Sequence, residues 1–253
     1  MSGIPGLIAA AVTPRKPNEE IDVGAAFELL DFLSRAGVDG IALFTAIGEY
    51  PSLAAGERSR LLYLCVKRSR APLFAGVGAA TLDGSLSLAR DARSAGAAGV
   101  LLPPPHFFRY EQDDIREFYL QFAAHFGSGA PIYIADTAEF TSAIDPETLR
   151  ELLATGLFAG VADNVSEAAC AIPELVRVRP DDASAVDARV LEFTAWTRRF
   201  PATIALKAAL NVRGLKTGPF HVPLTAAKQR KLDEFRLWFQ VLLAGLKKHS
   251  AHA

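Results

Sequence analysis

The stretch PLFAGVGAATLDGSLSLARDARSAGAAGVLLP (residues 72–103) contains the repeating unit from which we expect the whole fold to be built. It opens with an apolar run at residues 72–77 and ends in a second apolar run at residues 99–102. Between them lies an amphipathic segment at residues 84–95, which Gly96 closes. Short apolar runs that alternate with longer amphipathic segments are typical of βα units around a parallel sheet. The stretch therefore predicts a strand, a helix and a second strand.

The same alternation continues on both sides of this stretch. Six apolar runs are predicted to be strands, at residues 7–12, 40–44, 72–77, 99–102, 131–136 and 158–163. An amphipathic segment that predicts a helix follows each run, and the last of these segments is residues 166–176. The runs lack the polar alternation of a sheet with one face in water, so we expect both faces of the sheet to be covered.

Toward the C-terminus the pattern predicts helices without further strands, at residues 185–200, 202–215 and 224–248. A length of 253 residues is common for a single α/β barrel, and no low-complexity linker divides the chain. We therefore predict one structural domain, in which residues 1–180 form the barrel portion and residues 181–253 form helices packed on it.

The composition argues against several classes of function. Hydrophobic residues make up 50% of the chain, charged residues 22%, and the net charge is -1, so neither nucleic acid nor a membrane is an expected partner. The first residues carry no basic segment, and no stretch reaches the roughly 20 apolar residues that cross a bilayer, which predicts a cytoplasmic protein. Cys65 and Cys170 lack companions at metal or redox spacing and are predicted to be reduced, packed thiols.

No cofactor is expected. The five histidines show neither an HxH nor an HExxH spacing, so the sequence predicts no metal site. The run Gly76-Val-Gly78 is not a dinucleotide fingerprint, because no third glycine follows at the required offset.

Five motifs follow one another in an order that is informative as a set. They are Val12-Thr13-Pro14 with Ile21-Asp22, Thr45-Ala-Ile-Gly-Glu49-Tyr-Pro-Ser-Leu53 with Glu57-Arg58, Ala75-Gly-Val-Gly78, Pro104-Pro-His-Phe-Phe108 with Gln112, and residues 204–215 with Pro223-Leu224. Together they resemble the dihydrodipicolinate synthase and N-acetylneuraminate lyase family of class I pyruvate aldolases over most of the chain. The resemblance implies an α/β fold of the TIM (β/α)8 barrel type, here shortened to about six βα units with a C-terminal helical extension. It also implies a homo-oligomer, commonly a dimer or tetramer.

Members of the family place two further βα units before the C-terminal helices, and this chain shows no pattern for them. An arc of six strands cannot close as an eight-stranded barrel does, so the first and sixth strands are expected to be unpaired edges that need cover. The C-terminal helices, a second subunit, or a segment that the native gene encodes and this chain lacks could each account for the gap.

The resemblance also shows what the chain lacks. In the family, a lysine in a G-x-K-D-like run adds to the carbonyl of a 2-oxo acid, and the resulting iminium accepts electrons during carbon–carbon bond chemistry. The run Gly160-Val-Ala-Asp163 places Ala162 at this position, and none of the eight lysines lies in residues 158–164. The family tyrosine that handles protons falls on Ala135. The resemblance therefore implies a divergent member without Schiff-base aldolase activity.

Further departures are expected in the same pocket. Ala46 and Ile47 replace the two hydroxyls of the family's carboxylate-binding loop, and His106 and Phe107 replace a pair of tyrosines. An arginine that binds substrate in some members falls on Phe140.

What remains fits binding of a small carboxylate. The turn at residues 45–49 keeps backbone amides that could hold a carboxylate or phosphate. The residues predicted to bind such a ligand are Thr45, Gly48, Glu49, Thr141 and Asn164. Glu49 also has a structural interpretation, because in the family this glutamate supports the loop.

Candidates for catalysis lie near the expected C-terminal ends of strands, where barrel sites are built. His106 and Asp136 could form an acid/base pair if their side chains meet. Tyr133 lies two residues before Ala135 and so points to the same face of its strand, although a tyrosine that fills the barrel interior explains it as well. Lys207 could supply an amine, but the resemblance places it on a helix whose lysine does not form the Schiff base.

The sequence thus leaves three hypotheses for function. The first is a protein of this family that lacks Schiff-base chemistry and binds at most a small carboxylic acid of the 2-oxo acid class. The second is an active lyase or hydrolase with rearranged acid/base residues drawn from His106, Tyr133 and Asp136. The third is a structural or regulatory partner of an active paralogue. Whether the chain is an enzyme stays open at this level.

Overall fold

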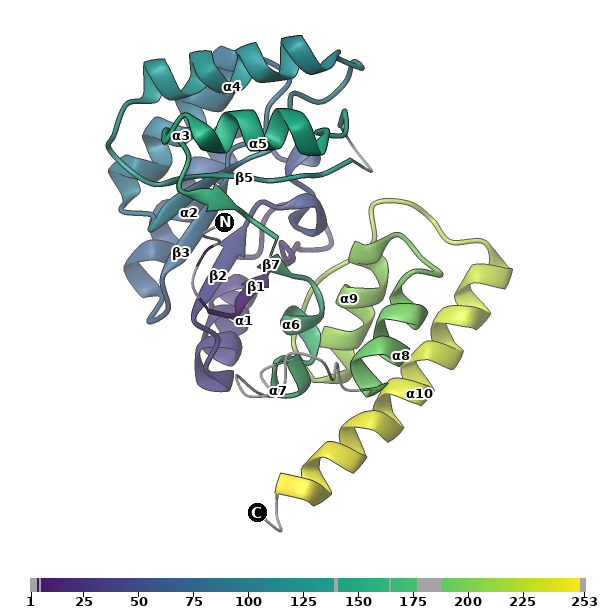
Figure 1. Cartoon of the computed structure of the whole chain (residues 1–253). Helices are drawn as coiled ribbons and strands as arrows, with labels where there is room; N and C mark the ends of the chain where they lie inside the picture. The colour runs from purple at the N-terminus through teal and green to yellow at the C-terminus, as the bar shows by residue number, and fades with distance from the viewer. Residues whose placement is uncertain (1–3, 5, 139–140, 164, 177–187, 251–253) are drawn as a thin grey trace.

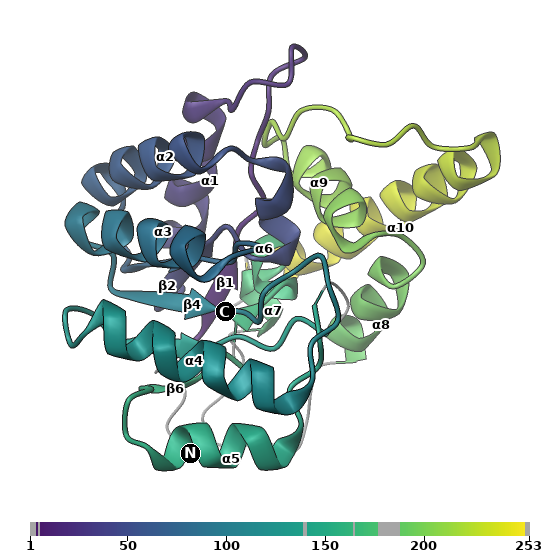
Figure 2. The same ribbon diagram turned by 90° about the horizontal axis from the view of Figure 1, so that it is seen from above.

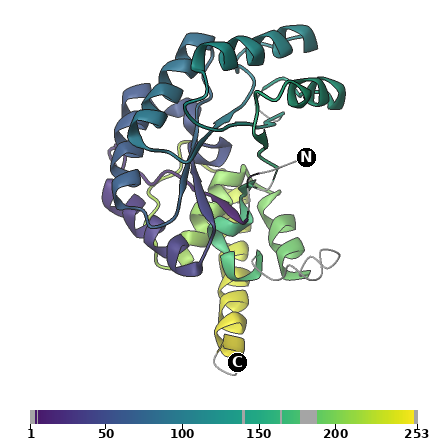
Figure 3. The same cartoon turned by 60° about the vertical axis from the view of Figure 1, so that its left-hand side comes forward.

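The computed structural model of the chain describes residues 4, 6–138, 141–163, 165–176 and 188–250. Within these ranges, seven parallel strands form one curled sheet, and helices follow the outside of its arc (Figures 1 and 3). The strands are β1 (Ile8–Ala10), β2 (Gly40–Leu43), β3 (Leu73–Gly76), β4 (Gly99–Leu102), β5 (Ile132–Ile134), β6 (Gly160–Val161) and β7 (Val165–Ser166). This half-barrel with C-terminal helices confirms the prediction of a shortened TIM-type α/β barrel.

A helix follows each of the first five strands, as predicted, whereas the single helix predicted at residues 166–176 is observed as β7 and two four-residue helices. The barrel portion thus has seven α-helices among the described residues. They are α1 (Val23–Ala36), α2 (Ala55–Arg68), α3 (Leu82–Ala95), α4 (Gln112–Phe126), α5 (Pro146–Ala154), α6 (Ala168–Ala171) and α7 (Pro173–Val176). Gly37 and Gly96 close α1 and α3 with φ of 76° and 90°, a left-handed conformation that glycine adopts without steric cost. Viewed from above, α1 to α4 lie side by side around the sheet (Figure 2).

The number of strands and the edges of the sheet differ from the prediction. The strand order is β6-β5-β4-β3-β2-β1-β7, so the first strand is not an open edge, because β7 pairs with it through Ile8 and Val165. The sequence predicts no regular element at residue 165 and the start of a helix at residue 166. In the structure the two residues form this seventh strand instead. β6 and β7 lie at opposite ends of the sheet although only three residues separate them in the chain.

Alternation along the strands produces two apolar layers. Residues such as Ile41 and Leu43 of β2 pack toward the helices in the main core, whereas Ala42 between them faces the inside of the arc. The inner layer consists of Ile4, Ile8, Ala42, Phe74, Leu101 and Tyr133. Both faces of the sheet are therefore covered, as the unbroken apolar runs predict.

Three helices complete the fold, namely α8 (Ala188–Thr197), α9 (Ala202–Val212) and α10 (Ala226–Ser250). Phe193 of α8 packs against Phe235 and Phe239 of α10, with ring centroids 6.1 and 5.7 Å away. Arg213, directly after α9, forms a bidentate ion pair with Glu174 of α7 at 2.9 and 2.8 Å. The helices thus pack against one flank of the barrel portion, and α10 extends beyond them (Figure 1). In the described part of the chain, no helix combines the length and apolar content that a membrane span requires.

Candidate functional site

A cavity of about 130 Å³ lies at the C-terminal ends of the strands. Its lining comes from almost every strand of the sheet or the residues that follow it: Ala10, Phe44, Thr45, Ala46, Tyr50, Gly76, Leu101, Pro103, Ala135, Asp136, Thr137, Ala162, Val165 and Glu167. This end of a parallel barrel is where active sites are built, because the loops that follow the strands converge there. The cavity is therefore the first candidate for a functional site.

The lining contains no primary amine. Ala135 and Ala162 both face the cavity, as the sequence resemblance implies for the positions of the tyrosine and the lysine. Among the described lining residues no lysine occurs. Lys207 is fully buried, and its Nζ lies 2.6 Å from Oε2 of Glu49. Its amine is therefore held by a carboxylate and does not line the cavity.

Two hydroxyl groups in the lining are buried and have no hydrogen-bond partner within the described protein: Oγ1 of Thr45 and the hydroxyl of Tyr50. Nδ1 of His106 is also buried and unpartnered, and the His106 ring lies edge-on to Tyr50 with centroids 5.5 Å apart. Buried polar groups are nearly always paired, so a group of unpaired ones calls for an explanation such as water or a ligand.

The turn that carries Thr45 is strained at both ends. Phe44 and Glu49 have φ of 58° and 57°, which only a few per cent of non-glycine residues adopt. Between them, η1 (Ala46–Gly48) forms one short 3-10 turn. Gly76 allows the backbone to come this close, because a Cβ atom there would lie 2.1 Å from the Phe44 carbonyl oxygen. Strain of this kind concentrates at functional sites.

Behind Tyr50 lies a buried guanidinium. Arg58 donates hydrogen bonds to the carbonyl oxygens of Gly76 and Gly78 at 2.6 and 2.8 Å, and its Cζ lies 5.3 Å from the centre of the Tyr50 ring. Burial lowers the pKa of Arg58 to about 10, so it stays charged at neutral pH. Burial raises the pKa of Tyr50, and the charge of Arg58 opposes this only in part. The phenol is therefore protonated at neutral pH and available as a donor.

His106 and Asp136 do not form the acid/base pair considered from the sequence. Asp136 lines the cavity, whereas His106 lies beside it against Tyr50. Within the described residues no hydrogen bond or ion pair joins the two side chains. Burial raises the pKa of Asp136, and a backbone hydrogen bond at Ala138 opposes the effect. Burial, followed by the charge of Arg58, lowers the pKa of His106.

Tyr133, Thr141 and Gly48 were also considered from the sequence, and they do not line the cavity in the part of the chain that the structure describes. Tyr133 belongs to the inner apolar layer, where its ring lies 6.0 Å from that of Phe74, which fits the interpretation as a barrel-filling residue. Thr141 is buried and donates to the carbonyl oxygen of Thr137 at 3.1 Å. The Gly48 carbonyl accepts from Oγ1 of Thr13 at 2.8 Å. Asn164 and Phe140 lie outside the described residues.

A larger cleft of about 730 Å³ adjoins the cavity and shares Ala46, Tyr50 and Glu167 with it. Glu49 lines this cleft, accepts a hydrogen bond from Lys207, and lies 3.5 Å from Nε2 of His221. Glu49 thus ties the turn after β2 to α9, a geometry that fits the supporting role considered from the sequence.

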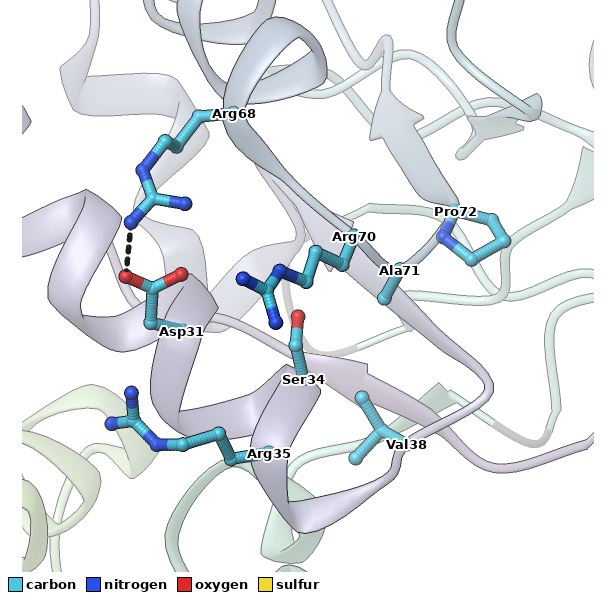
Figure 4. Close-up of a pocket in the computed structure, with 8 residues that line it drawn as sticks. All are labelled: Asp31, Ser34, Arg35, Val38, Arg68, Arg70, Ala71 and Pro72. Carbon is cyan, nitrogen blue, oxygen red and sulfur yellow. Dashed lines mark hydrogen bonds and ion pairs between the residues drawn. The ribbon is translucent and has the colours of Figure 1, made fainter.

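A third hollow lies at the opposite end of the barrel. Its volume is about 330 Å³, and Arg35, Arg68 and Arg70 surround it, with Arg68 bonded to Asp31 (Figure 4). Arg35 and Arg68 lie in the last turns of α1 and α2, where cations stabilise the negative end of the helix dipole. The arginines therefore have a structural explanation, and the N-terminal face of a barrel is the face associated with stability.

Tyr50 and Glu167 line the cavity and were not singled out from the sequence. Tyr50 follows the strained turn directly, and the only available signal was its place beside Glu49 in the loop motif. Glu167 lies two residues beyond Val165, and no sequence pattern brought it to the cavity. The local backbone conformation brings both side chains to the cavity, and a sequence motif does not specify that conformation. The described residues contain no cluster of three metal-ligating side chains.

Comparison with known proteins gives a consistent result. A model of the dihydrodipicolinate synthetase family matches residues 4–181. The 4-hydroxy-tetrahydrodipicolinate synthase 1 of Streptomyces coelicolor is 30% identical, over 87% of this chain and 88% of its own. An uncharacterized DapA-like lyase of Halobacterium salinarum is 27% identical over 88% of each chain.

Solved structures agree in fold. A dihydrodipicolinate synthase from Agrobacterium tumefaciens superposes with a TM-score of 0.84 at 22% identity, over 94% of this chain and 99% of that one. YagE of E. coli, solved in complex with pyruvate, gives a TM-score of 0.80 at 18% identity, over 97% and 99% of the two chains. At these identities the likeness establishes the fold alone.

Proposed function

Because the chain belongs to the dihydrodipicolinate synthetase family, we propose that it binds a small carboxylic acid of the 2-oxo acid class in the cavity at the C-terminal ends of its strands, without forming a Schiff base. The observation that carries the proposal is the pair of methyl groups that Ala135 and Ala162 present where the family resemblance implies a phenol and an amine. A methyl group can neither add to a carbonyl nor transfer a proton. What the cavity retains is suited to reversible binding.

The size and polarity of the cavity support a small ligand. About 130 Å³ lies well below the roughly 300–1,000 Å³ of pockets for drug-sized molecules, so only a few non-hydrogen atoms fit. The unpartnered hydroxyl of Thr45 is a donor for a carboxylate oxygen at one wall. A ligand that supplies this hydroxyl with an acceptor removes an unsatisfied polar group and gains a charge-assisted hydrogen bond.

The charges around the cavity limit the affinity. Asp136 and Glu167 line it, while the described lining includes no cationic side chain. An anionic ligand is therefore expected to place its carboxylate at the Thr45 hydroxyl and to be repelled by the carboxylate of Asp136. Modest affinity follows, and it improves when Asp136 takes up a proton.

Borohydride trapping tests the proposal. The protein is incubated with pyruvate, then with other 2-oxo acids, and its intact mass is measured after borohydride, which converts an iminium into a stable amine. We expect no mass increase, together with a measurable heat of pyruvate binding in isothermal titration calorimetry. The Streptomyces coelicolor synthase, treated in parallel, serves as the comparison. An adduct mapped to any lysine would overturn the absence of Schiff-base chemistry, and a lack of binding heat for every acid would overturn the binding role.

We also propose a homo-oligomer that uses the loop after β4. Phe107 and Phe108 are 82% and 64% exposed, and their rings pack edge-on 5.2 Å apart. Phe107 has φ of 95°, a strained conformation for a bulky residue. Aromatic side chains exposed in this way are typical of interfaces between subunits. Multi-angle light scattering is expected to give a mass above the 27.1 kDa of one chain, and Phe107→Ser to lower it. A wild-type protein that stays at 27.1 kDa at micromolar concentration would contradict the proposal.

A further inference from the structure

The hydroxyl of Tyr50 is a buried polar group at the cavity for which the described structure provides no hydrogen-bond partner. The residue is only 2% exposed, and its hydroxyl finds no partner among the described residues. It lies at the start of η2 (Tyr50–Ser52) and lines both the small cavity and the larger cleft, so it stands where the two meet. A ligand in the cavity would therefore lie beside the Tyr50 side chain.

The position of the Tyr50 ring is fixed by its neighbours. Gly78 leaves the space that the ring occupies, because a Cβ atom there would lie 2.8 Å from Cε2 of Tyr50. His106 packs edge-on at 5.5 Å, and Arg58 lies on another side with Cζ 5.3 Å from the ring centre. Since the ring is held on several sides, its hydroxyl cannot turn toward bulk water without disturbing these contacts. The hydroxyl is preorganised for a partner inside the cavity.

A bound 2-oxo acid has two kinds of oxygen to satisfy. The carboxylate is negative and finds a donor in the unpartnered hydroxyl of Thr45, whereas an ionised Asp136 repels it. The 2-oxo oxygen is neutral and needs one donor. Thr137 also lines the cavity, but its hydroxyl already lies 3.2 Å from that of Thr141. Among the described side chains of the lining, Tyr50 is then the neutral donor left for the 2-oxo group.

We propose that the Tyr50 hydroxyl donates a hydrogen bond to the 2-oxo oxygen of the bound acid, and that it thereby selects 2-oxo acids over acids that lack this oxygen. The inference rests on the proposed function. The family resemblance implies a tyrosine at the position of Ala135, after β5. In this chain the phenol of the cavity would come instead from Tyr50, in the loop after β2. Arg58 and His106 act on the ligand only through the Tyr50 ring and are positioning residues.

The test compares Tyr50→Phe with Tyr63→Phe. Tyr63 is 51% exposed on α2, away from the cavity, so its variant controls for the loss of a phenol as such. Calorimetry measures binding of pyruvate and of propionate, which has the same carboxylate and no 2-oxo oxygen. The wild type and Tyr63→Phe are expected to bind pyruvate about tenfold or more tightly than propionate. This factor corresponds to one hydrogen bond whose absence leaves a buried donor unsatisfied. In Tyr50→Phe this preference is expected to fall toward one.

The outcomes separate the two proposals. If Tyr50→Phe binds pyruvate as tightly as the wild type, the hydroxyl is satisfied by water and the inference is wrong, while the binding role stands. If Tyr50→Phe weakens pyruvate and propionate equally, the hydroxyl serves the carboxylate and the assignment is wrong. If the wild type binds neither acid, both the binding role and the inference are overturned. A Tyr50→Phe melting temperature equal to or above that of the wild type confirms that the variant is folded, because an unpartnered buried hydroxyl contributes no stabilising bond.

Discussion

The Nζ atom of Lys207 lies 2.6 Å from Oε2 of Glu49, although 158 residues separate the two in the chain. Lys207 is fully buried on α9, and Glu49 sits with positive φ at the end of the strained turn that lines the cavity. Thr203, also on α9, donates to the carbonyl oxygen of Ile47 at 3.2 Å. The shape of the turn therefore depends on the C-terminal helices as well as on the barrel.

Replacing Lys207 by methionine is expected to destabilise the protein. Loss of one partner of a buried ion pair costs about 3–5 kcal/mol, and the partial exposure of Glu49 brings our expectation toward about 2–3 kcal/mol. Pyruvate affinity is expected to fall as well, because the turn loses its anchor. Chemical denaturation and calorimetry measure the two effects. Lys216→Met, at an exposed position nearby in sequence, is the control. A Lys207→Met protein as stable as this control would show that the pair contributes nothing.

Replacing Ala162 by lysine is expected to restore an amine to the cavity. The new side chain would reach the space beside Ala135, and burial would lower its pKa toward the range in which the neutral amine is nucleophilic. Borohydride after pyruvate is expected to label Ala162→Lys and leave the wild type unlabelled. Intact mass and peptide mapping detect the label. A folded, unlabelled variant would mean that position 162 does not deliver a side chain to the ligand.

The pKa of Asp136 predicts a pH dependence of binding. Partial desolvation raises this pKa above its ordinary value, so Asp136 loses its charge at a higher pH than a fully solvated aspartate as the solution is acidified. Pyruvate remains an anion near this raised pKa, and its affinity is expected to rise as the pH falls from 7 through the pKa of Asp136. Asp136→Asn is expected to bind more tightly at pH 7 and to show a flatter profile. Identical profiles for the variant and the wild type would exclude Asp136 as the source.

The same shift has a consequence for stability. Because the folded pKa lies above the unfolded one, the ionised carboxylate is disfavoured in the folded state once the pH exceeds the folded pKa. Asp136→Asn is therefore expected to melt at a higher temperature than the wild type at pH 7. The difference in melting temperature between Asp136→Asn and the wild type should vanish below the pKa that Asp136 has in the unfolded chain. There the Asp136 carboxyl group is protonated in the folded and the unfolded state alike. If the stability advantage of Asp136→Asn over the wild type grew as the pH was lowered, the prediction would be wrong.

Gly76 and Gly56 form a matched pair for testing the close approach at the turn. A Cβ atom at Gly76 would lie 2.1 Å from the Phe44 carbonyl oxygen, whereas one at Gly56 on α2 would meet nothing within 4 Å. Gly76→Ala is expected to destabilise by about 1–3 kcal/mol or more through overpacking. Gly56→Ala is expected to stabilise by about 0.4–1 kcal/mol through a smaller loss of backbone entropy on folding. Urea denaturation of both variants measures the contrast, and equal effects would contradict it.

The sequence predicted the part of the fold that depends on periodicity. The first five predicted strands overlap the observed β1 to β5, and a helix follows each of them as predicted, because alternating apolar and amphipathic runs report local structure directly. The two-residue strand β7 was missed, since a segment that short has no period. Its pairing with β1 depends on the path of the chain across the opening of the arc.

For the site, the resemblance correctly indicated that Ala135 and Ala162 share one pocket. It did not identify Tyr50, whose ring reaches the cavity only because Gly78 leaves room for it and the turn is strained. Strand periodicity placed Tyr133 on the same face as Ala135 and left two roles open, and in the structure its ring lies among the apolar side chains of the inner layer. Tertiary packing determines how deep a side chain lies in the barrel and which residues more than 150 positions apart come into contact. A single sequence does not show this packing.

The pairing of β1 with β7 also bears on how the chain acquires its shape during synthesis. Ile8 has Gly40 as one neighbour early in the chain, but its other neighbour, Val165, emerges from the ribosome much later. The successive βα units can form from contacts close in sequence, whereas the last pairing must close a loop that spans most of the barrel. Until then, one side of β1 presents free backbone groups, and a nascent chain stalled before residue 165 would be open to association with other strands.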